Sequence, residues 1–244
     1  MLFWKKKEVK PLDLSWLVAD MHSHLLPGID DGSQDMESSL ELIKGLVKHG
    51  YKKIVTTPHI FWEMYPNTSE IIKEKTEELK VAVAAEGISV EITAAAEYFI
   101  DEHFEIELKD KIPLLTVKDN MVLVEFSMLT QPLDLTDILF EMQMQNYQPI
   151  IAHPERYTYL RHKKEFFDDL KNSGCFFQLN LLALCGIYGH TVQELAEYLL
   201  RKNYYDFAGT DMHHVKHLEA LQKLSGSPLY LQLQQSKNIK NRML

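Results

Sequence analysis

Short apolar runs alternate with longer amphipathic segments through most of this 244-residue chain. Apolar runs bounded by polar residues predict buried strands, and apolar residues repeating every three or four positions predict helices. The segment 101–117 is too irregular to assign, and the tail from Ser225 fits either a short last helix or a frayed end. The expected strands are residues 16–21, 53–57, 90–96, 121–126, 149–152, 176–181 and 205–209, and the expected helices are residues 34–49, 69–85, 134–146, 163–172, 191–202 and 214–223.

The ends of the first two helices carry boundary residues. Ser33 is the expected N-cap of the first helix, because its hydroxyl can accept a hydrogen bond from the first turn. Gly50 and Gly87 stand where these helices should end, in the position that favours a left-handed residue.

The alternation of strands and helices predicts an α/β fold. Strands joined by helices form right-handed crossover units, and repeated units of this kind close into a barrel. Glycine and proline are sparse and no low-complexity linker divides the chain, so one domain over residues 1–244 is expected. The pattern therefore predicts a barrel with seven strands.

Oxygen and nitrogen donors recur where these strands end. Asp20-Met-His22-Ser-His24 spans the end of the first strand, and Asp211-Met-His213 follows the last. Residues i and i+2 of an extended segment project to the same side, so each motif can aim two donors at one point. Active sites of such barrels lie at the C-terminal strand ends, where closure brings the donors together. The nine expected metal ligands are His22, His24, Asp31, His59, Glu97, Glu125, His153, Asp211 and His213.

Taken one at a time, some of these residues have simpler explanations. A single histidine such as His59 or His153 is more often a hydrogen-bonded structural residue than a metal ligand. Glu97 and Glu125 differ, because each follows an apolar strand where a carboxylate would be costly to bury without a cation. The recurrence of donors at strand ends therefore predicts a multinuclear metal hydrolase.

Composition narrows the compartment and the partners. A net charge of −9 disfavours binding to nucleic acid. The apolar start of the chain is followed at once by Lys5, Lys6 and Lys7, and no long uncharged segment follows, so neither a signal peptide nor an integral membrane protein is expected. Cys175 and Cys185 are too few for a disulfide framework, which favours the cytoplasm.

The motifs together resemble the polymerase-and-histidinol-phosphatase (PHP) superfamily. Within it, the chain is most similar to the manganese-dependent protein-tyrosine phosphatases of bacterial capsule and exopolysaccharide gene clusters. The resemblance extends from about Asp20 to His214 and rests on Asp20-Met-His22-Ser-His24, Pro27-Gly-Ile-Asp-Asp31-Gly32, Thr57-Pro-His59, Ala96-Glu97, Glu125-Phe, His153-Pro-Glu-Arg156-Tyr157 and Thr210-Asp211-Met-His213.

This resemblance implies a (β/α)7 barrel, a distorted TIM-like PHP fold, that holds three divalent metal ions. Shells of imidazole and carboxylate suit Mn²⁺, Fe and Zn²⁺ alike, so manganese is implied by the family alone. By analogy, His22, His24, Glu97 and Asp211 hold the first ion, Glu97 bridges to a second ion held by Glu125 and His153, and Asp31, His59 and His213 hold the third.

The expected chemistry is hydrolysis of a phosphate monoester by a metal-activated hydroxide, without a phosphoenzyme. Glu97, Asp211 and Arg156 are the expected catalytic residues. Arg156 is the expected phosphate clamp, because a guanidinium matches two phosphoryl oxygens, although a loop salt bridge with Glu155 would also explain it.

A second phosphate contact is less well defined. Relatives commonly carry another arginine after the last Asp-x-His motif, and this chain has none there. Lys216, His214 or His217 would then supply the contact, with Lys216 and His214 as the expected substrate-binding residues.

Tyrosine phosphatases of another class use a low-pKa cysteine in a phosphate-binding loop. Neither Cys175 nor Cys185 begins such a loop, so a structural role is expected for both thiols.

Aromatic residues gather after His59. The segment 60–65, with Tyr98, Phe99 and Tyr157, could wall a slot for a phenyl ring. Core packing or a subunit contact explains the same residues almost as well, and the sequence leaves open whether the chain forms a homo-oligomer.

The partner that the resemblance implies is a tyrosine-phosphorylated bacterial kinase that regulates polysaccharide export, or the flexible tail of that kinase. Two alternatives stay open. One is a PHP phosphatase that acts on a small metabolite such as histidinol phosphate, and the other is a non-catalytic metal-binding regulatory domain.

Overall fold

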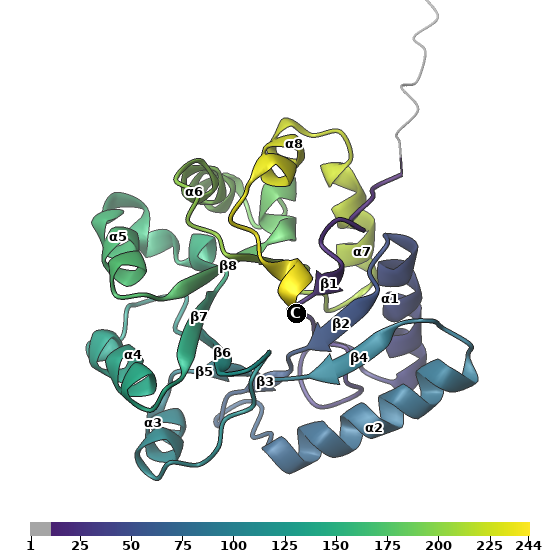
Figure 1. Cartoon of the computed structure of the whole chain (residues 1–244), viewed down its shortest axis with the longest axis horizontal. Coiled ribbons are helices and arrows are strands. Elements are labelled where there is room, and N and C mark those ends of the chain that lie inside the picture. The colour runs from purple at the N-terminus through teal and green to yellow at the C-terminus, as the bar shows by residue number, and fades with distance from the viewer. Residues whose placement is uncertain (1–10) are drawn as a thin grey trace, which may run out of the picture.

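In the computed structural model, parallel strands form a curved wall that helices cover on the outside (Figure 1). The structure describes residues 11–244. The basic cluster Lys5 to Lys7 lies outside the described residues. All strand pairs between the elements named here are parallel. The strands are β1 (Ala19–Asp20), β2 (Lys53–Thr56), β3 (His59–Ile60), β4 (Glu91–Ala94), β5 (Glu97–Phe99), β6 (Met121–Glu125), β7 (Gln148–Ala152), β8 (Phe176–Asn180) and β9 (Phe207–Gly209).

Two sheets together make the barrel wall. One has the order β1-β2-β4, and the other has the order β3-β5-β6-β7-β8-β9. β3 continues β2 beyond Pro58, which has no N–H to donate, and β5 continues β4 after a short interruption. A parallel bridge between Ser23 and Met212 joins the segments that follow β1 and β9. The wall thus has seven strand positions, and the expected distorted TIM-like (β/α)7 barrel is confirmed.

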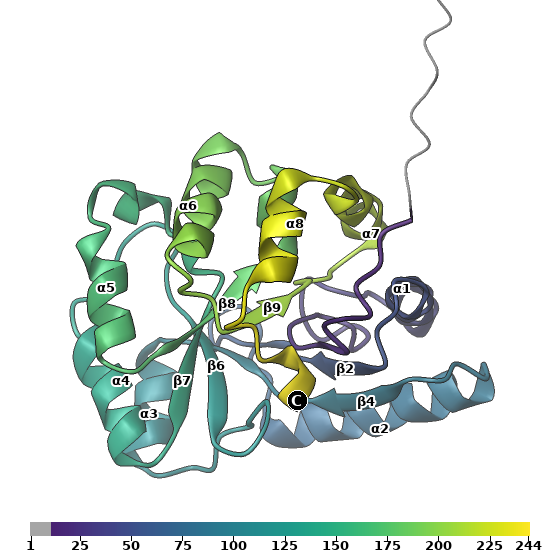
Figure 2. The same ribbon diagram turned by 45° about the horizontal axis from the view of Figure 1, so that its top comes forward.

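All six expected helices are present, with ends that differ from the prediction by a few residues at most. The unassigned segment contains α3, and the tail forms α8 (Figure 2). The helices are α1 (Met36–Lys48), α2 (Ser69–Ala85), α3 (Glu102–Lys109), α4 (Leu135–Met144), α5 (Glu165–Asn172), α6 (His190–Arg201), α7 (Val215–Leu221) and α8 (Pro228–Gln235). Short 3₁₀ helices span Pro154–Arg156, Thr158–His162, Leu181–Cys185, Gln222–Leu224 and Asn241–Met243.

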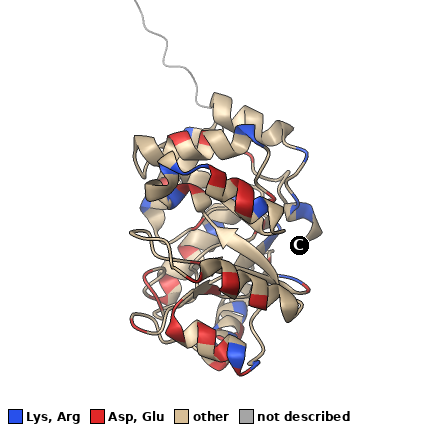
Figure 3. Cartoon of the chain, turned by 90° about the vertical axis from the view of Figure 1, so that its left-hand side faces the viewer, with Lys and Arg blue, Asp and Glu red and all other residues tan. Residues whose placement is uncertain are grey.

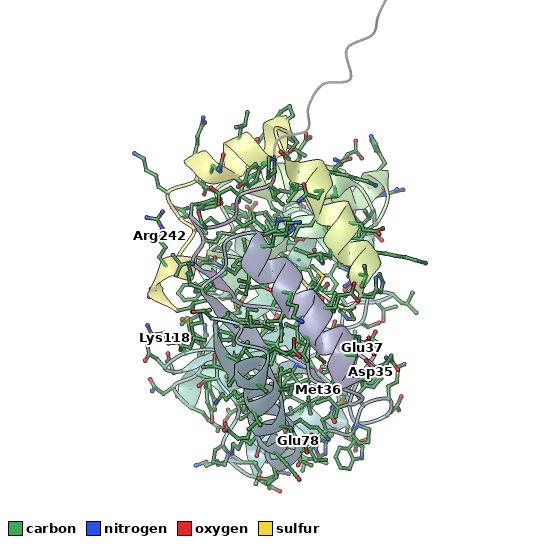
Figure 4. All side chains as sticks on the ribbon, turned by 90° about the vertical axis from the view of Figure 1, so that its right-hand side faces the viewer. Asp35, Met36, Glu37, Glu78, Lys118 and Arg242 are labelled. Atoms are coloured by element: carbon green, nitrogen blue, oxygen red, sulfur yellow. The ribbon has the colours of Figure 1, made fainter. Side chains whose placement is uncertain are left out.

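The expected N-cap of α1 is wrong. Asp35, at the start of the helix in Figure 4, caps it instead. Its side chain accepts a hydrogen bond from the N–H of Ser38, and the Ser38 hydroxyl accepts one from the N–H of Asp35. Ser33 is held elsewhere, because its N–H donates to the carbonyl of His24. Gly50 and Gly87 directly follow the C-caps of α1 and α2 with positive φ, as expected.

Two further differences have local causes. The first strand begins only at Ala19, because Val18 adopts a left-handed backbone with a φ of 69° that ends the extended conformation before it. α3 escaped prediction because it has only two fully buried residues, Phe104 and Leu108, and so shows a weak apolar period.

The two faces of the strands pack into separate apolar clusters. Leu123 and Ile150 belong to a small cluster inside the barrel, whereas their neighbours Val122 and Ile151 belong to a large cluster that includes the inner faces of the helices. This alternation is the period of two that a strand buried on both faces imposes. Among residues 11–244, no helix has both the length and the apolar content needed to cross a bilayer.

Candidate metal centre

The nine expected ligands gather at the C-terminal end of the barrel wall. Two of them have a left-handed backbone: φ is 31° at His153, directly after β7, and 50° at Asp211, shortly after β9. Such values are uncommon for residues other than glycine and persist where the surroundings fix them. Gly209 allows a close approach as well, since a Cβ there would lie 2.6 Å from Cβ of His22. The backbone is thus adapted to crowd these side chains together.

Four donor atoms converge on one point. Nε2 of His22 lies 3.1 Å from Oε2 of Glu97 and 3.3 Å from Oδ1 of Asp211. Nε2 of His24 lies 3.3 Å and 3.4 Å from the same two oxygens and 3.2 Å from Nε2 of His22. Separations of 3.1–3.4 Å are those of neighbouring donors on one divalent ion, which lies about 2.0 Å from its nitrogen and oxygen ligands. This donor set therefore fits a metal ion.

Glu97 faces two groups of donors at once. Its Oε2 belongs to the group just described, while its Oε1 lies 2.9 Å from Nε2 of His153. Glu125 approaches the same region, with Oε2 3.8 Å from Nε2 of His153 and Oε1 3.1 Å from Nδ1 of His59. A carboxylate that presents its two oxygens to different donor groups can bridge two cations. The arrangement fits a second ion beside the first.

The remaining donors lie nearest the cavity opening. Oδ1 of Asp31 is 3.5 Å from Nε2 of His59 and 3.4 Å from Nε2 of His213. Half of the Asp31 side chain is exposed, whereas His59 and His213 are mostly buried. These three residues and His24 form one of four overlapping groups with metal-binding geometry in the described chain. All nine expected ligands thus occur in these groups.

The carboxylates at the centre stay ionised although they are buried. Burial alone would raise the pKa of Glu97, but His22 and His59 lower it well below its usual value. Burial likewise opposes ionisation of Asp211, and His22 and His213 bring its pKa well below the usual range. Ionised carboxylates are the form that binds a cation.

Residues behind the ligands fix how the imidazoles point. Oε1 of Gln178, in β8, lies 2.9 Å from Nδ1 of His22 and accepts a hydrogen bond from the N–H of His153. An amide oxygen can only accept, so Nδ1 of His22 is the donor and the ring is oriented with Nε2 toward the centre. Nδ2 of Asn180 donates to Oδ2 of Asp211 at 2.6 Å. Both amides contact residues that are far away in the sequence, so the sequence gave no partner for either.

Arg156 lies at the edge of the donor cluster. Its Nη1 is 3.2 Å from Oδ2 of Asp211, and its guanidinium carbon is 4.8 Å from the ring centre of Tyr188. The competing salt bridge with Glu155 does not form, because the buried Glu155 accepts hydrogen bonds from the N–H of Asn180 and the hydroxyl of Tyr205. The guanidinium therefore faces the cavity, where a phosphate would lie.

The residues expected to supply a second phosphate contact differ in their position relative to the cavity. His214 lines the cavity, whereas Lys216 is exposed and is not among the lining residues. His217, one turn further along α7, does line it. Burial, His214 and His213 lower the pKa of His217 to about 4, so a neutral imidazole occupies this edge of the cavity.

A cavity of about 430 Å³ opens above the donors. Of the aromatic residues considered for a phenyl slot, Phe61, Tyr65 and Phe99 line it, and the rings of Phe61 and Phe99 stack with centres 4.1 Å apart. Tyr98 and Tyr157 are buried away from it, where their hydroxyl groups accept backbone hydrogen bonds from Leu115 and Phe126. Met64 of the segment 60–65 lines the cavity as well, and so do Met128 and Tyr188, which the sequence did not indicate.

The cysteines take no part in this arrangement. Both are free thiols, and neither lines the cavity. Burial raises the pKa of Cys175 and raises that of Cys185 to about 12. Both groups are therefore thiols at neutral pH, not thiolate nucleophiles.

The chain is similar to known phosphatases over most of its length. The tyrosine-protein phosphatase YwqE of Bacillus subtilis is 30% identical over 198 residues, which are 81% of this chain and 78% of YwqE. The tyrosine-protein phosphatase CpsB of Streptococcus agalactiae is 30% identical over 202 residues, which are 80% of this chain and 83% of CpsB.

A solved structure agrees with the fold. It is one of the crystal structures of YwqE from Bacillus subtilis and CpsB from Streptococcus pneumoniae, which are described as unique metal-dependent tyrosine phosphatases. It matches with a TM-score of 0.77 and 27% identity, over 91% of this chain and 95% of its own. The model of the capsular polysaccharide synthesis family CpsB/CapC matches residues 18–233. The chain therefore belongs to the CpsB/CapC family.

Proposed function

We propose that this chain is a metal-dependent protein-tyrosine phosphatase that acts in capsular or exopolysaccharide synthesis. The observation that carries the proposal is the position of one guanidinium, that of Arg156, beside a buried set of nine imidazoles and carboxylates in one cavity. Relatives over most of the chain are named tyrosine-protein phosphatases, which supports the same reaction here.

The donor groups support a site for three divalent ions, with Mn²⁺ as the first choice and Fe or Zn²⁺ as alternatives. Bound metal ions would supply an activated nucleophile from water and positive charge for the phosphoryl oxygens. In the proposed division, His22, His24, Glu97 and Asp211 hold the first ion, Glu97, Glu125 and His153 hold the second, and Asp31, His59 and His213 hold the third.

Other residues bind and orient the substrate. The guanidinium of Arg156 would clamp two phosphoryl oxygens, and Tyr188 beneath it limits its movement. Asn180 would hold Asp211 in place while Arg156 turns toward the phosphate. Phe61 and Phe99 present a stacked aromatic wall against which a phenyl ring can pack. His214 would add a polar contact at the rim, and Lys216 could reach the phosphate only through a change of its exposed side chain.

The proposed partner is a tyrosine-phosphorylated kinase of the polysaccharide export machinery, or its flexible tail. A flexible segment suits this site because the phosphoryl group must reach donors that are almost fully buried. We place the reaction in the cytoplasm, where the two free thiols are stable. One domain over residues 1–244 would carry the whole activity.

One assay separates this function from its alternatives. Metal-depleted protein is reloaded with Mn²⁺ and given a phosphotyrosine peptide, histidinol phosphate and single-stranded DNA in parallel. We expect the phosphotyrosine peptide to have the highest kcat/KM. A preference for histidinol phosphate or DNA would overturn the proposal, and turnover of none would favour a regulatory metal-binding role.

A further inference from the structure

The catalytic cavity continues into a groove on the outer surface. Met128 and Tyr188 line both the cavity and a groove of about 550 Å³ that also contains Tyr159. Arg161 and Thr191 in turn line both this groove and a further depression of about 360 Å³. Because each hollow shares residues with the next, one continuous path, here called the α6 groove, leads from the candidate metal centre to the outside of α6.

The near part of the α6 groove has a mixed lining. Met128, Leu129, Tyr159 and Val192 contribute apolar side chains, and Thr158, His190 and Thr191 contribute polar ones. Leu129 is 84% exposed, so its side chain is accessible to a bound peptide. The hydroxyl of Tyr159 donates to the carbonyl of Ser127, so the ring is fixed as part of the floor. This stretch suits a few residues of an extended peptide.

The far part of the groove has an excess of available positive charge. Three cations, Arg161, Lys164 and Arg201, and two carboxylates, Glu194 and Glu197, line it. Glu197 is paired with Arg201 at 3.3 Å. Within the described chain, Arg161 has no carboxylate within 4.0 Å, and the same holds for Lys164, whose Nζ lies over the ring of Tyr198. Local charge therefore opposes the net charge of −9 of the whole chain. Figure 3 shows this side of the molecule, where basic and acidic residues are mixed on the helices.

We propose that the α6 groove binds the segment that flanks the phosphotyrosine in a protein substrate, and that this segment carries acidic residues. The inference rests on the proposed phosphatase function and adds the substrate class to it. A phosphotyrosine that enters the cavity leaves its chain outside, and the groove begins at the cavity rim. Because Arg161 and Lys164 line the outer depression and not the cavity rim, the acidic residues of the substrate would lie a few positions away from the phosphotyrosine, not next to it.

Three phosphotyrosine peptides test the groove: one with glutamates beginning three residues before the phosphotyrosine, one with glutamates beginning three residues after it, and one with neutral residues throughout. We expect one acidic peptide to exceed the neutral peptide in kcat/KM by about fivefold to tenfold at low salt, because each exposed ion pair changes affinity by a factor of up to about five. The preference should shrink as ionic strength rises.

Variants then locate the effect. Arg161→Ala and Lys164→Ala should each lower the ratio of kcat/KM between the preferred acidic peptide and the neutral peptide by about twofold to fivefold. Arg161→Glu should bring the ratio to one or below. Lys44→Ala removes an exposed charge, paired with Glu86, from α1 on the other side of the barrel, and should leave the ratio unchanged (Figure 1).

Free phosphotyrosine separates the two proposals. If the wild-type protein hydrolyses it but treats all three peptides alike, the groove proposal is wrong and the phosphatase function stands. A preference for an acidic peptide that survives both Arg161→Glu and Lys164→Ala would also overturn the groove proposal. If no phosphotyrosine substrate is hydrolysed, both proposals fail.

Discussion

Oδ2 of Asp30 lies 2.8 Å from Nδ1 of His24 and accepts a hydrogen bond from the backbone N–H of His59. The other carboxylate oxygen accepts from the N–H of Gly32. Asp30 thereby ties one proposed ligand, the backbone of another and the loop that carries Asp31 to a single buried group. Although burial opposes ionisation, His24 lowers the pKa of Asp30 to about 2, so the carboxylate is charged at neutral pH.

This contact predicts that Asp30→Asn weakens metal binding without removing a ligand. The carboxylate fixes the proton of His24 on Nδ1 and leaves Nε2 free for the metal, and loss of such a partner typically lowers affinity by about 10- to 100-fold. Competition with a chelating dye would measure the affinity. Asp169→Asn on the exposed face of α5 is the matched control. Equal affinities of the two variants would contradict the role given to Asp30.

Arg156→Ala should separate catalysis from metal binding. Loss of the clamp is expected to lower kcat/KM for a phosphotyrosine peptide by about 100-fold, comparable to the removal of one charge-stabilising donor from another active site. Metal content should stay at the wild-type level, because Asn180 still holds Asp211. Arg156→Lys keeps the charge but loses the bidentate geometry, so its kcat/KM should lie between those of the wild type and the alanine variant. Metal analysis and steady-state kinetics on the same samples would decide the matter, and full activity of the alanine variant would exclude the clamp.

Removal of metal should cost both activity and stability. The donor groups hold several ionised carboxylates close together in the barrel interior, where a bound cation would stabilise them. A ligand that binds only the folded state, at a concentration 100 times its Kd, adds about 2.7 kcal/mol to the free energy of unfolding. For a chain of this size, that corresponds to a fall in Tm of roughly 5–10 °C on chelation. Calorimetry before and after reloading with Mn²⁺ measures the change. Glu97→Gln should show the low Tm whether or not Mn²⁺ is added, whereas a response equal to that of the wild type would argue against a central role for Glu97.

The sequence predicted the strand ends and their donors well, because a buried strand and a carboxylate at its end both leave local signals. Glu97 shows this: it follows a short apolar run, and the structure places it between two groups of histidines. Residues that are distant in the sequence and come into contact only in the folded chain left no such local signal. Nothing near Gln178 in the sequence points to His22, which is 156 residues away.

The loops were harder to predict for the same reason. Asp31 was expected as a ligand, but nothing in the sequence indicated that the adjacent Asp30 would contact His24 and the backbone of His59. Tyr188 lies in an irregular loop before α6, where no apolar period indicates whether a side chain is buried. Its place against Arg156 depends on the packing of two βα loops, which is a property of the closed barrel.

The final prediction concerns the thiols. The double variant Cys175→Ser and Cys185→Ser should keep the kcat/KM of the wild type, because the reaction proposed here needs no thiolate. Burial keeps both cysteines protonated at neutral pH, so brief treatment of the wild-type protein with iodoacetamide at pH 7 should also leave activity intact. Cys175 is 1% exposed, and replacing it with a hydroxyl should lower the unfolding free energy by about 1–2 kcal/mol, which a denaturant titration would detect separately. Loss of turnover in a variant that remains folded and metal-loaded would point to a cysteine nucleophile after all.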